Sequence, residues 1–351
     1  MPAGVHGEWQ RAKIAADAFI SGSTMSRRPL LAAALAVLSL LAAGPTHAQD
    51  WPQAGKTIQV VVPAPGGSGT GDTIARVLAE ELQSRLKTTF VIDNKAGANG
   101  NIGASAAATM PGDGYHFLFS WAGTLAVNKA LYKNLPFDAQ KDFVPILLVA
   151  DVPNILVVNN DIPAKDLADF EKYAKANPGK LNFGSTGIGS SMHLAGELYM
   201  RETGAKMLHV PYNAPGTATT NLIAGDIQLM FQLIPGIAGQ VKSGKVRAIA
   251  VMAPQRSPAL PDVPTTAELG QPRLLSSTWF ALLAPKGTPP AVIARMNAVA
   301  NEILADPAVK KRLADMGAST LGGTPLQLAE HLAAETEKWG RVVREARIAA
   351  Q

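Results

Sequence analysis

Residues 56–86 read KTIQVVVPAPGGSGTGDTIARVLAEELQSRL, a hydrophobic run followed by a glycine loop and an amphipathic stretch. The β-branched run at 58–62 predicts a strand that is covered on both faces. Asp72 is the expected N-cap of the following helix, whose apolar face repeats every fourth residue from Ile74 to Leu86. Together these features predict a strand–loop–helix unit at the start of an α/β domain.

The loop between that strand and helix has no residue larger than proline. Such a loop lets a ligand approach the main chain, where amide N–H groups and the helix dipole favour an anion. Each amide hydrogen bond to a charged acceptor contributes about 1.5–3 kcal/mol. The alternative is that the glycines only make a tight turn, although a plain βα turn needs far fewer small residues. The ligand-binding residues expected here are Gly66, Gly67, Ser68, Gly69 and Thr70.

The 351-residue chain is 47% hydrophobic and 17% charged, which is typical of a globular protein. It has no cysteine, which excludes disulfides and thiol chemistry. The formal net charge of +5 is mild, and no Lys/Arg cluster alternates with aromatic residues, so nucleic acid is not an expected partner. A weak positive bias does suit an anionic ligand.

Residues 1–48 are expected to be an upstream extension followed by a secretory signal peptide, with Met25 as the start. The arginine pair 27–28 precedes an apolar run at 30–43, which is too short to span a membrane, and small residues before Gln49 form a cleavage site. The arginine pair also resembles a twin-arginine signal, so the general secretory and twin-arginine routes both stay open. Either route predicts a periplasmic protein.

Further strands are expected at 90–93 and 115–120, with an alanine-rich helix at 104–110 between them. Alternating strands and helices with short links predict a parallel sheet, and ligands bind beyond the carboxyl ends of such strands. Ser120 and Trp121 lie at one of these ends and are expected in the site.

The chain is predicted to form two domains with the ligand between them. Strands at 143–149 and 155–158 flank a first crossing between the domains at 151–154, and a return crossing is placed at 278–284. The predicted domain 1 comprises residues 51–151 and 283–351, and the predicted domain 2 comprises residues 152–282.

The second half repeats the opening plan, with a strand at 181–184, a hydroxyl-rich loop and a helix at 192–203. Tyr212 and Trp121 follow strand ends and either wall the cleft or pack ordinarily. The Gln232 amide either contacts a ligand or caps the next turn. The ligand-binding residues expected in this half are Thr186, Gly189, Ser190, Ser191, Tyr212 and Gln232.

Two enzyme classes compete with a binding function. Gly67, Gly69 and Gly71 invite a dinucleotide motif, but Asp72 stands where the third glycine should pack, and there is no G-K-[ST] of a P-loop. A serine hydrolase would need a carboxylate partner for His193, which otherwise tethers its loop, and the histidines lack metal spacing. No catalytic activity, cofactor or metal site is therefore expected.

Specific short motifs are spread along nearly the whole mature chain. They are VVVP at 60–63 with PGG at 65–67 and Asp72, DNKAGANGNIG at 93–103, GDGY at 112–115, AVN at 126–128 with LY at 131–132, GIGSS at 187–191 with HLAGEL at 193–198, HVPY at 209–212 and LPDVPT at 260–265. Jointly they resemble the receptors of the tripartite tricarboxylate transporter family, the Bug-type periplasmic receptors.

This resemblance implies a two-domain periplasmic binding protein of type II-like fold, each domain a mostly parallel sheet flanked by helices. It implies that loops equivalent to 66–70 and 186–191 hold a small organic carboxylate, partly through water. The implied partner is the set of membrane permease subunits of a transporter, and the receptor is expected to be a monomer. A ligand-sensing receptor for a signalling system stays an open alternative.

Two departures from the family pattern bear on the ligand. The glycine loop at 66–72 is longer than the usual form, and Phe231-Gln232 stands where the family commonly has Phe-Asp. An aspartate there would suit a ligand amine, so its absence argues against an amino acid. Because Trp121 lies in the family's Ser/Thr-rich second loop, an aromatic or otherwise bulky carboxylate is favoured.

Overall fold

The computed structural model describes residues 51–67 and 69–345, which belong to the compact unit Trp51–Gln351. The predicted signal peptide, the Met25 start, Ser68 and the last residues of the chain lie outside the described residues. None of the described helices is long and apolar enough to cross a membrane.

The elements of the first half are β1 (Thr57–Val62), α3 (Gly69–Leu86), β2 (Thr89–Asn94), η1 (Ala98–Gly100), α4 (Asn101–Ala108), β3 (His116–Trp121), η2 (Gly123–Val127), α5 (Asn128–Leu131), β4 (Phe143–Val158) and α6 (Leu167–Ala176). Those of the second half are β5 (Asn182–Ser185), α7 (Ser191–Thr203), β6 (Leu208–Pro211), α8 (Pro215–Ala224), β7 (Leu229–Leu233), α9 (Ile234–Lys242), β8 (Arg247–Val251), β9 (Ser277–Pro285), α10 (Pro290–Ala305), α11 (Pro307–Asp315), β10 (Ser319–Gly322) and α12 (Pro325–Glu345).

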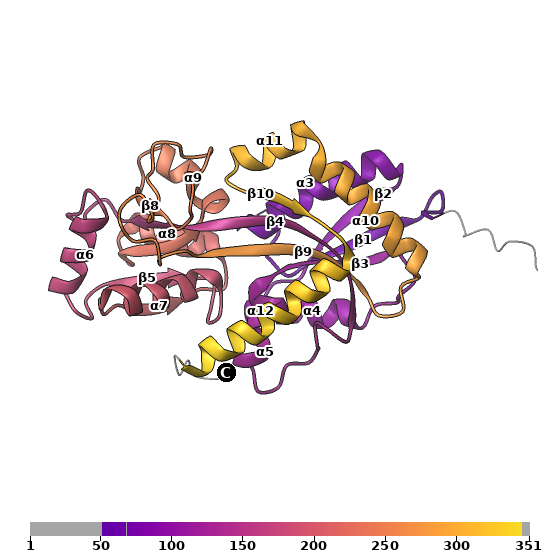
Figure 1. Ribbon diagram of the computed structural model, residues 1–351, viewed down its shortest axis with the longest axis horizontal. Helices are drawn as coiled ribbons and strands as arrows, with labels where there is room; N and C mark the ends of the chain where they lie inside the picture. The colour runs from indigo at the N-terminus through magenta and orange to yellow at the C-terminus, as the bar shows by residue number, and fades with distance from the viewer. Residues whose placement is uncertain (1–50, 68, 346–351) are drawn as a thin grey trace, which may run out of the picture. The chain divides into compact units, whose positions relative to one another are not determined.

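The strands form one mixed sheet in the order β2-β1-β3-β9-β4-β7-β5-β6, and β8 and β10 also pair with β4. The pairs β1–β2, β1–β3, β5–β6 and β5–β7 are parallel, as the alternation of strands and helices predicts. The long strands β4 and β9 pair antiparallel with each other and run side by side in Figure 1. The α/β fold class, a sheet flanked by helices, is confirmed. The expected mostly parallel arrangement is wrong, because β4 and β9 pair antiparallel with all their partner strands and make the sheet mixed.

The strands expected at 143–149 and 155–158 are wrong as separate elements, because β4 is continuous over Phe143–Val158. Residues 150–153 pair with β9, and from Asn154 onward the strand pairs with β7 and β8. The chain therefore exchanges one group of partner strands for another without a turn. That this place separates two domains stays a prediction.

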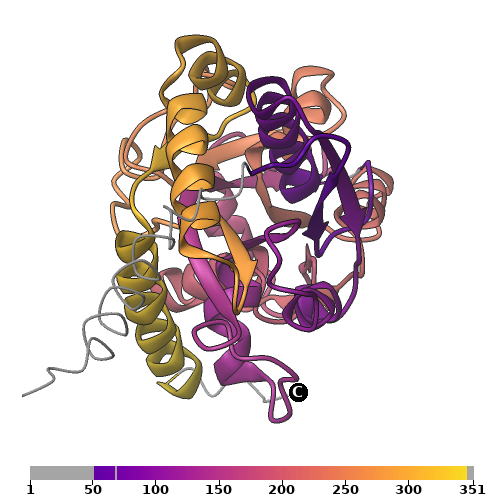
Figure 2. The same cartoon turned by 90° about the vertical axis from the view of Figure 1, so that its right-hand side faces the viewer.

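The apolar face predicted for α3 is confirmed, since Ile74, Leu78, Leu82 and Leu86 are all buried in a core that also contains side chains of β1 and α10. Full burial of such a side chain contributes about 1.5–3 kcal/mol. Figure 2 shows α3 beside α10, and Arg85 of α3 forms an ion pair at 2.9 Å with Asp306, the residue between α10 and α11. This packing fixes where the first turn of α3 lies.

Candidate functional site

A cavity of about 270 Å³ lies where several helices begin. Its wall includes Gly69 and Thr70 at the start of α3, and Ser190 and Ser191 at the start of α7. The N–H groups of a helix's first turn have no intrahelical partner and carry the positive end of the helix dipole. The cavity therefore gathers main-chain hydrogen-bond donors from two helix starts that are far apart in the sequence.

The chain before α3 is held by a buried carboxylate. One oxygen of Asp72 accepts hydrogen bonds from Gly67 N–H (2.9 Å) and Arg76 Nε (2.8 Å), and the other accepts from Asn94 Nδ2 (2.8 Å). Burial alone would raise the pKa of Asp72, but the hydrogen bonds from Arg76, Asn94 and Gly67 outweigh it and hold this pKa below its ordinary value of 3.8. Asp72 is therefore an anion that pins the glycine loop at neutral pH.

The expectation that Asp72 is the N-cap of α3 is wrong, because the helix begins at Gly69 and Asp72 lies within its first turn. From this position the carboxylate reaches back to the loop instead of capping the helix from outside. Asn94 adds a second tie, since its Nδ2 also donates to the Ala64 carbonyl oxygen (3.1 Å).

Residues 96–100, between β2 and α4, also line the cavity and were not among the expected site residues. Asn99 adopts a left-handed conformation (φ 50°, ψ 39°). Its Nδ2 donates to Asn128 Oδ1 (2.8 Å) and to the Ile188 carbonyl oxygen (3.3 Å) in the loop before α7. The small-residue run AGANG ahead of a helix could have indicated this segment, because it repeats the pattern of the other two loops.

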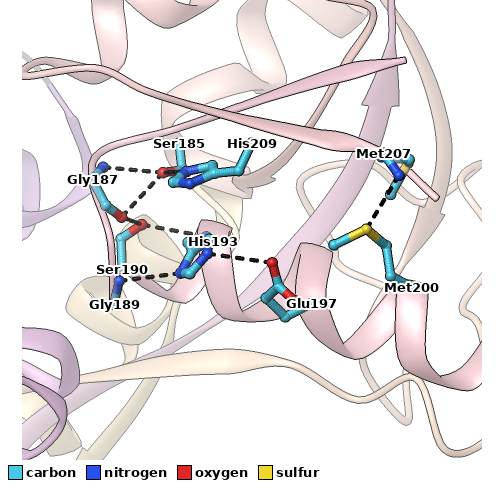
Figure 3. A network of polar contacts seen from close by, with 9 residues as sticks. All are labelled: Ser185, Gly187, Gly189, Ser190, His193, Glu197, Met200, Met207 and His209. Atoms are coloured by element: carbon cyan, nitrogen blue, oxygen red, sulfur yellow. Dashed lines mark hydrogen bonds and ion pairs between the residues drawn. The ribbon is translucent and has the colours of Figure 1, made fainter. Parts of the chain in front are cut away.

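The loop before α7 is ordered by its own polar side chains (Figure 3). Ser190 is the N-cap of α7, since its Oγ accepts from His193 N–H (3.3 Å) and donates to the Gly187 carbonyl oxygen (2.7 Å). Gly189 N–H donates to His193 Nδ1 (3.2 Å). These contacts favour the interpretation that His193 tethers its loop. The Ser191 hydroxyl, next to the cap, forms no hydrogen bond with the described residues of this loop.

A second histidine, His209 of β6, also contacts the polar network of this loop. His209 Nε2 lies 2.6 Å from Ser185 Oγ, and the rings of His193 and His209 have centroids 4.1 Å apart. Burial and the neighbouring His193 lower the pKa of His209 to about 3, so its ring is neutral at pH 7. Ser185 is fully buried and also bonds to the Gly187 backbone, so this Ser–His contact holds the loop and does not present a nucleophile.

The cavity itself carries no charged side chain, because its described wall residues include no Asp, Glu, Lys, Arg or His. Two buried polar atoms of the wall, Thr70 Oγ1 and Gln232 Nε2, have no hydrogen-bond partner among the described residues. An anion in this cavity would be held by amide and hydroxyl groups alone. The aromatic part of the wall is formed by Trp121, Tyr132, Tyr212 and Phe280.

Most of the residues expected in the site lie around this one cavity. The eight that line it are Gly69, Thr70, Trp121, Thr186, Ser190, Ser191, Tyr212 and Gln232. Gly66, Gly67, Ser120 and Gly189 are not among its described wall residues, and Ser68 lies outside the described residues. That the eight contact a ligand stays a prediction.

A larger hollow of about 1510 Å³ lies on the other face of β9. Because side chains alternate along a strand, Ser277 and Trp279 line this hollow while Thr278 and Phe280 line the smaller cavity. The arginine and lysine side chains of the hollow form ion pairs with neighbouring carboxylates. The smaller cavity, with two helix starts in its wall, is therefore the better candidate for an anion site.

Known sequences include clear relatives of this chain. The family model of the tripartite tricarboxylate transporter family receptor matches residues 74–348. The chain is 39% identical to the protein BugT of Bordetella pertussis over 304 residues, which covers 86% of this chain and 92% of BugT.

Two solved structures are similar over nearly their whole length. A protein of R. palustris with adipate has a TM-score of 0.82 and 34% identity, covering 86% of this chain and 100% of that one. MatC from Rhodopseudomonas palustris with bound malate has a TM-score of 0.76 and 32% identity, covering 83% and 100%.

Proposed function

The chain belongs to the tripartite tricarboxylate transporter receptor family, and on this premise we propose that it is a periplasmic solute receptor that binds a small organic carboxylate and delivers it to the membrane permease subunits of such a transporter. The two structural relatives were solved with adipate and with malate, which are both dicarboxylates. They support a carboxylate as the ligand class.

The observation that carries this proposal is a cavity with helix starts in its wall and no charged side chain among its described residues. Three main-chain hydrogen bonds to a carboxylate contribute about 5–9 kcal/mol before the loss of translational freedom is subtracted. The aromatic side chains add apolar area for the rest of the ligand, which supports an aromatic or bulky carboxylate. A micromolar receptor needs a net binding free energy of about 8 kcal/mol.

In this proposal the carboxylate lies between the starts of α3 and α7, facing Gly69, Thr70 and Ser191, with Thr186 and Tyr212 at the sides. Residues 51–151 with 283–351 form one domain and residues 152–282 form the other, and they close on the ligand by a hinge in β4 and β9. The continuity of both strands supports a hinge of this kind, because a strand can bend without breaking its pairing.

The proposed receptor is monomeric and has no catalytic activity. The polar network of the α7 loop supports the absence of hydrolytic activity, since the Ser185 hydroxyl that contacts a histidine is buried and already bonded to the loop backbone. A hydrolase would need that hydroxyl open to its substrate.

Ligand-induced thermal stabilisation of the purified protein tests the proposal. Adipate, malate and benzoate are compared with glucose and spermidine at equal concentration. A carboxylate present at 100 times its dissociation constant should raise the melting temperature by about 4 °C. A melting temperature that rises only with glucose or spermidine, or that rises with none of the carboxylates, would count against a carboxylate receptor.

A further inference from the structure

Gln232 has one half of its amide engaged and the other half free. It is the fourth residue of β7 and is 1% exposed, and it lines the cavity. The backbone N–H of Leu233 donates to its Oε1 at 2.9 Å. Because an N–H group only donates, the amide atom on that side must be the oxygen, and the orientation of the side chain is fixed.

The free half of the amide is therefore Nε2, which donates hydrogen bonds and does not accept them. It is buried and has no partner among the described residues. An unsatisfied buried donor is destabilising, so a ligand atom that accepts its hydrogen bond gains more than it would from a donor already paired with protein.

Thr70 places a second unpartnered polar atom in the wall of the same cavity. A Cβ built at Gly236, in the first turn of α9, would lie 3.5 Å from Gln232 Oε1 and 3.7 Å from Thr70 Oγ1. Thr70 is 5% exposed, and its hydroxyl also lacks a partner in the described part of the chain. The two side chains come from β7 and α3 and border the same part of the cavity.

We propose that Gln232, assisted by Thr70, forms an uncharged donor subsite that receives a hydrogen-bond acceptor of the ligand beyond its first carboxylate, and that it rejects an ammonium group. The inference rests on the proposed carboxylate receptor and specifies its ligand class. The ligand carries a second carboxylate, a carbonyl or a hydroxyl group where it meets Gln232. An amino acid would instead turn its ammonium toward an N–H donor, with no carboxylate in the described wall to compensate.

Matched ligand pairs test this subsite by calorimetric titration at pH 8. Adipate is compared with 6-aminohexanoate, and malate with aspartate, so that an acceptor is exchanged for an ammonium group on the same carbon skeleton. The wild-type protein should bind the better acceptor ligand at least 10-fold more tightly than its ammonium counterpart. Equal affinity within both pairs would overturn the subsite while leaving the carboxylate receptor intact.

Two variants of Gln232 separate the donor from the mere shape of the side chain. Gln232→Glu keeps an acceptor for Leu233 N–H and turns a carboxylate to the cavity. It should therefore lower the affinity for the acceptor ligand at least 10-fold, and reduce or reverse the preference for the acceptor ligand over the ammonium ligand. Gln232→Met removes the donor without adding charge and should weaken the acceptor ligand about 10-fold with no gain for the ammonium ligand. Gln240→Glu adds the same charge on α9, at a residue that is not in the cavity wall, and should leave the preference for the acceptor ligand unchanged.

The possible results differ in what they overturn. Circular dichroism and melting curves establish whether each variant folds. If a variant does not fold, the affinities of the wild-type protein for the two ligand pairs still test the subsite. If Gln232→Glu weakens both members of a pair equally, Gln232 faces the first carboxylate and the second subsite is wrong. If the wild-type protein binds no carboxylate at all, the proposed function fails as well.

Discussion

Replacing Asp72 with alanine should destabilise the protein and loosen the glycine loop at the cavity. The carboxylate accepts three hydrogen bonds at 2.8–2.9 Å, and its side chain is 2% exposed. Removing one partner of a buried ion pair costs about 3–5 kcal/mol. Arg76 is half exposed and can be rehydrated, which places the expected loss at the lower end, about 3 kcal/mol.

For a domain of this size, a loss of about 3 kcal/mol lowers the melting temperature by about 5 °C. Ligand affinity should fall about 10-fold as well, because Gly67 and Asn94 lose the anchor that positions the loop. Differential scanning calorimetry with and without a carboxylate measures both effects. Asp315→Ala is a matched control, because Lys311 and Asp315 form an exposed pair at the same helical spacing and its removal should cost no more than about 0.5 kcal/mol.

The stabilisation that Asp72 provides should be lost at low pH. The pKa of Asp72 is lowered in the folded protein, so its stabilisation is complete above the pKa of the unfolded chain, near 3.8, and is lost as the pH falls through the lower folded value. The wild type and Asp72→Ala should therefore differ by a constant amount from pH 6 to pH 8 and converge below pH 3.8. A variant that melts within 1 °C of the Asp315→Ala control at pH 7 would refute the reasoning.

Three further predictions concern the loop supports and the wall. His209→Phe should make the stability of the fold less sensitive to acid. The pKa of His209 is about 3 in the folded protein and 6.5 in the unfolded chain, so the free energy of unfolding falls as the pH is lowered from 6.5 toward 3. In urea titrations the wild type should lose about 1.5 kcal/mol more of this free energy than the variant between pH 6.5 and pH 5. Trp121→Phe should remove most of the fluorescence change caused by a carboxylate, whereas a change of full size in the variant would show that the ligand does not lie against Trp121. Gly189→Ala should weaken carboxylate binding at least 10-fold in the same titration, because φ is +83° there and the added Cβ would overlap the Leu131 side chain; unchanged affinity would show that this contact does not shape the site.

Local patterns predicted much of the molecule. The apolar repeat of α3 and the β-branched run of β1 gave the correct elements, because burial of one face dictates both periods. The bare loops before α3 and α7 were also predicted as parts of one site, and residues of both line the cavity. Family motifs predicted the family, which the comparisons confirm.

Other features depend on which neighbours a residue meets. Asp72 has the residue type of an N-cap, yet it bonds back to Gly67 because the glycine-rich segment ahead of it is already helical from Gly69. Ser190 has a hydroxyl suited to a ligand, yet this group is engaged in capping α7. Side-chain type predicts what a group can bond to, and the surrounding structure decides what it does bond to.

The order of residues along the chain was thus sufficient for most of the elements, the small-residue loops and the ligand class that helix starts favour, since each depends on residues within about one or two turns of one another. The shared wall of Phe280 and Trp121, the placement of Thr70 and Gln232 around Gly236, and the single path of β4 through the sheet arise only in the folded molecule. Each of these features depends on contacts between segments that are far apart in the sequence. The preferences of neighbouring residues do not determine such contacts, because strand order and register are set by the packing of the whole sheet.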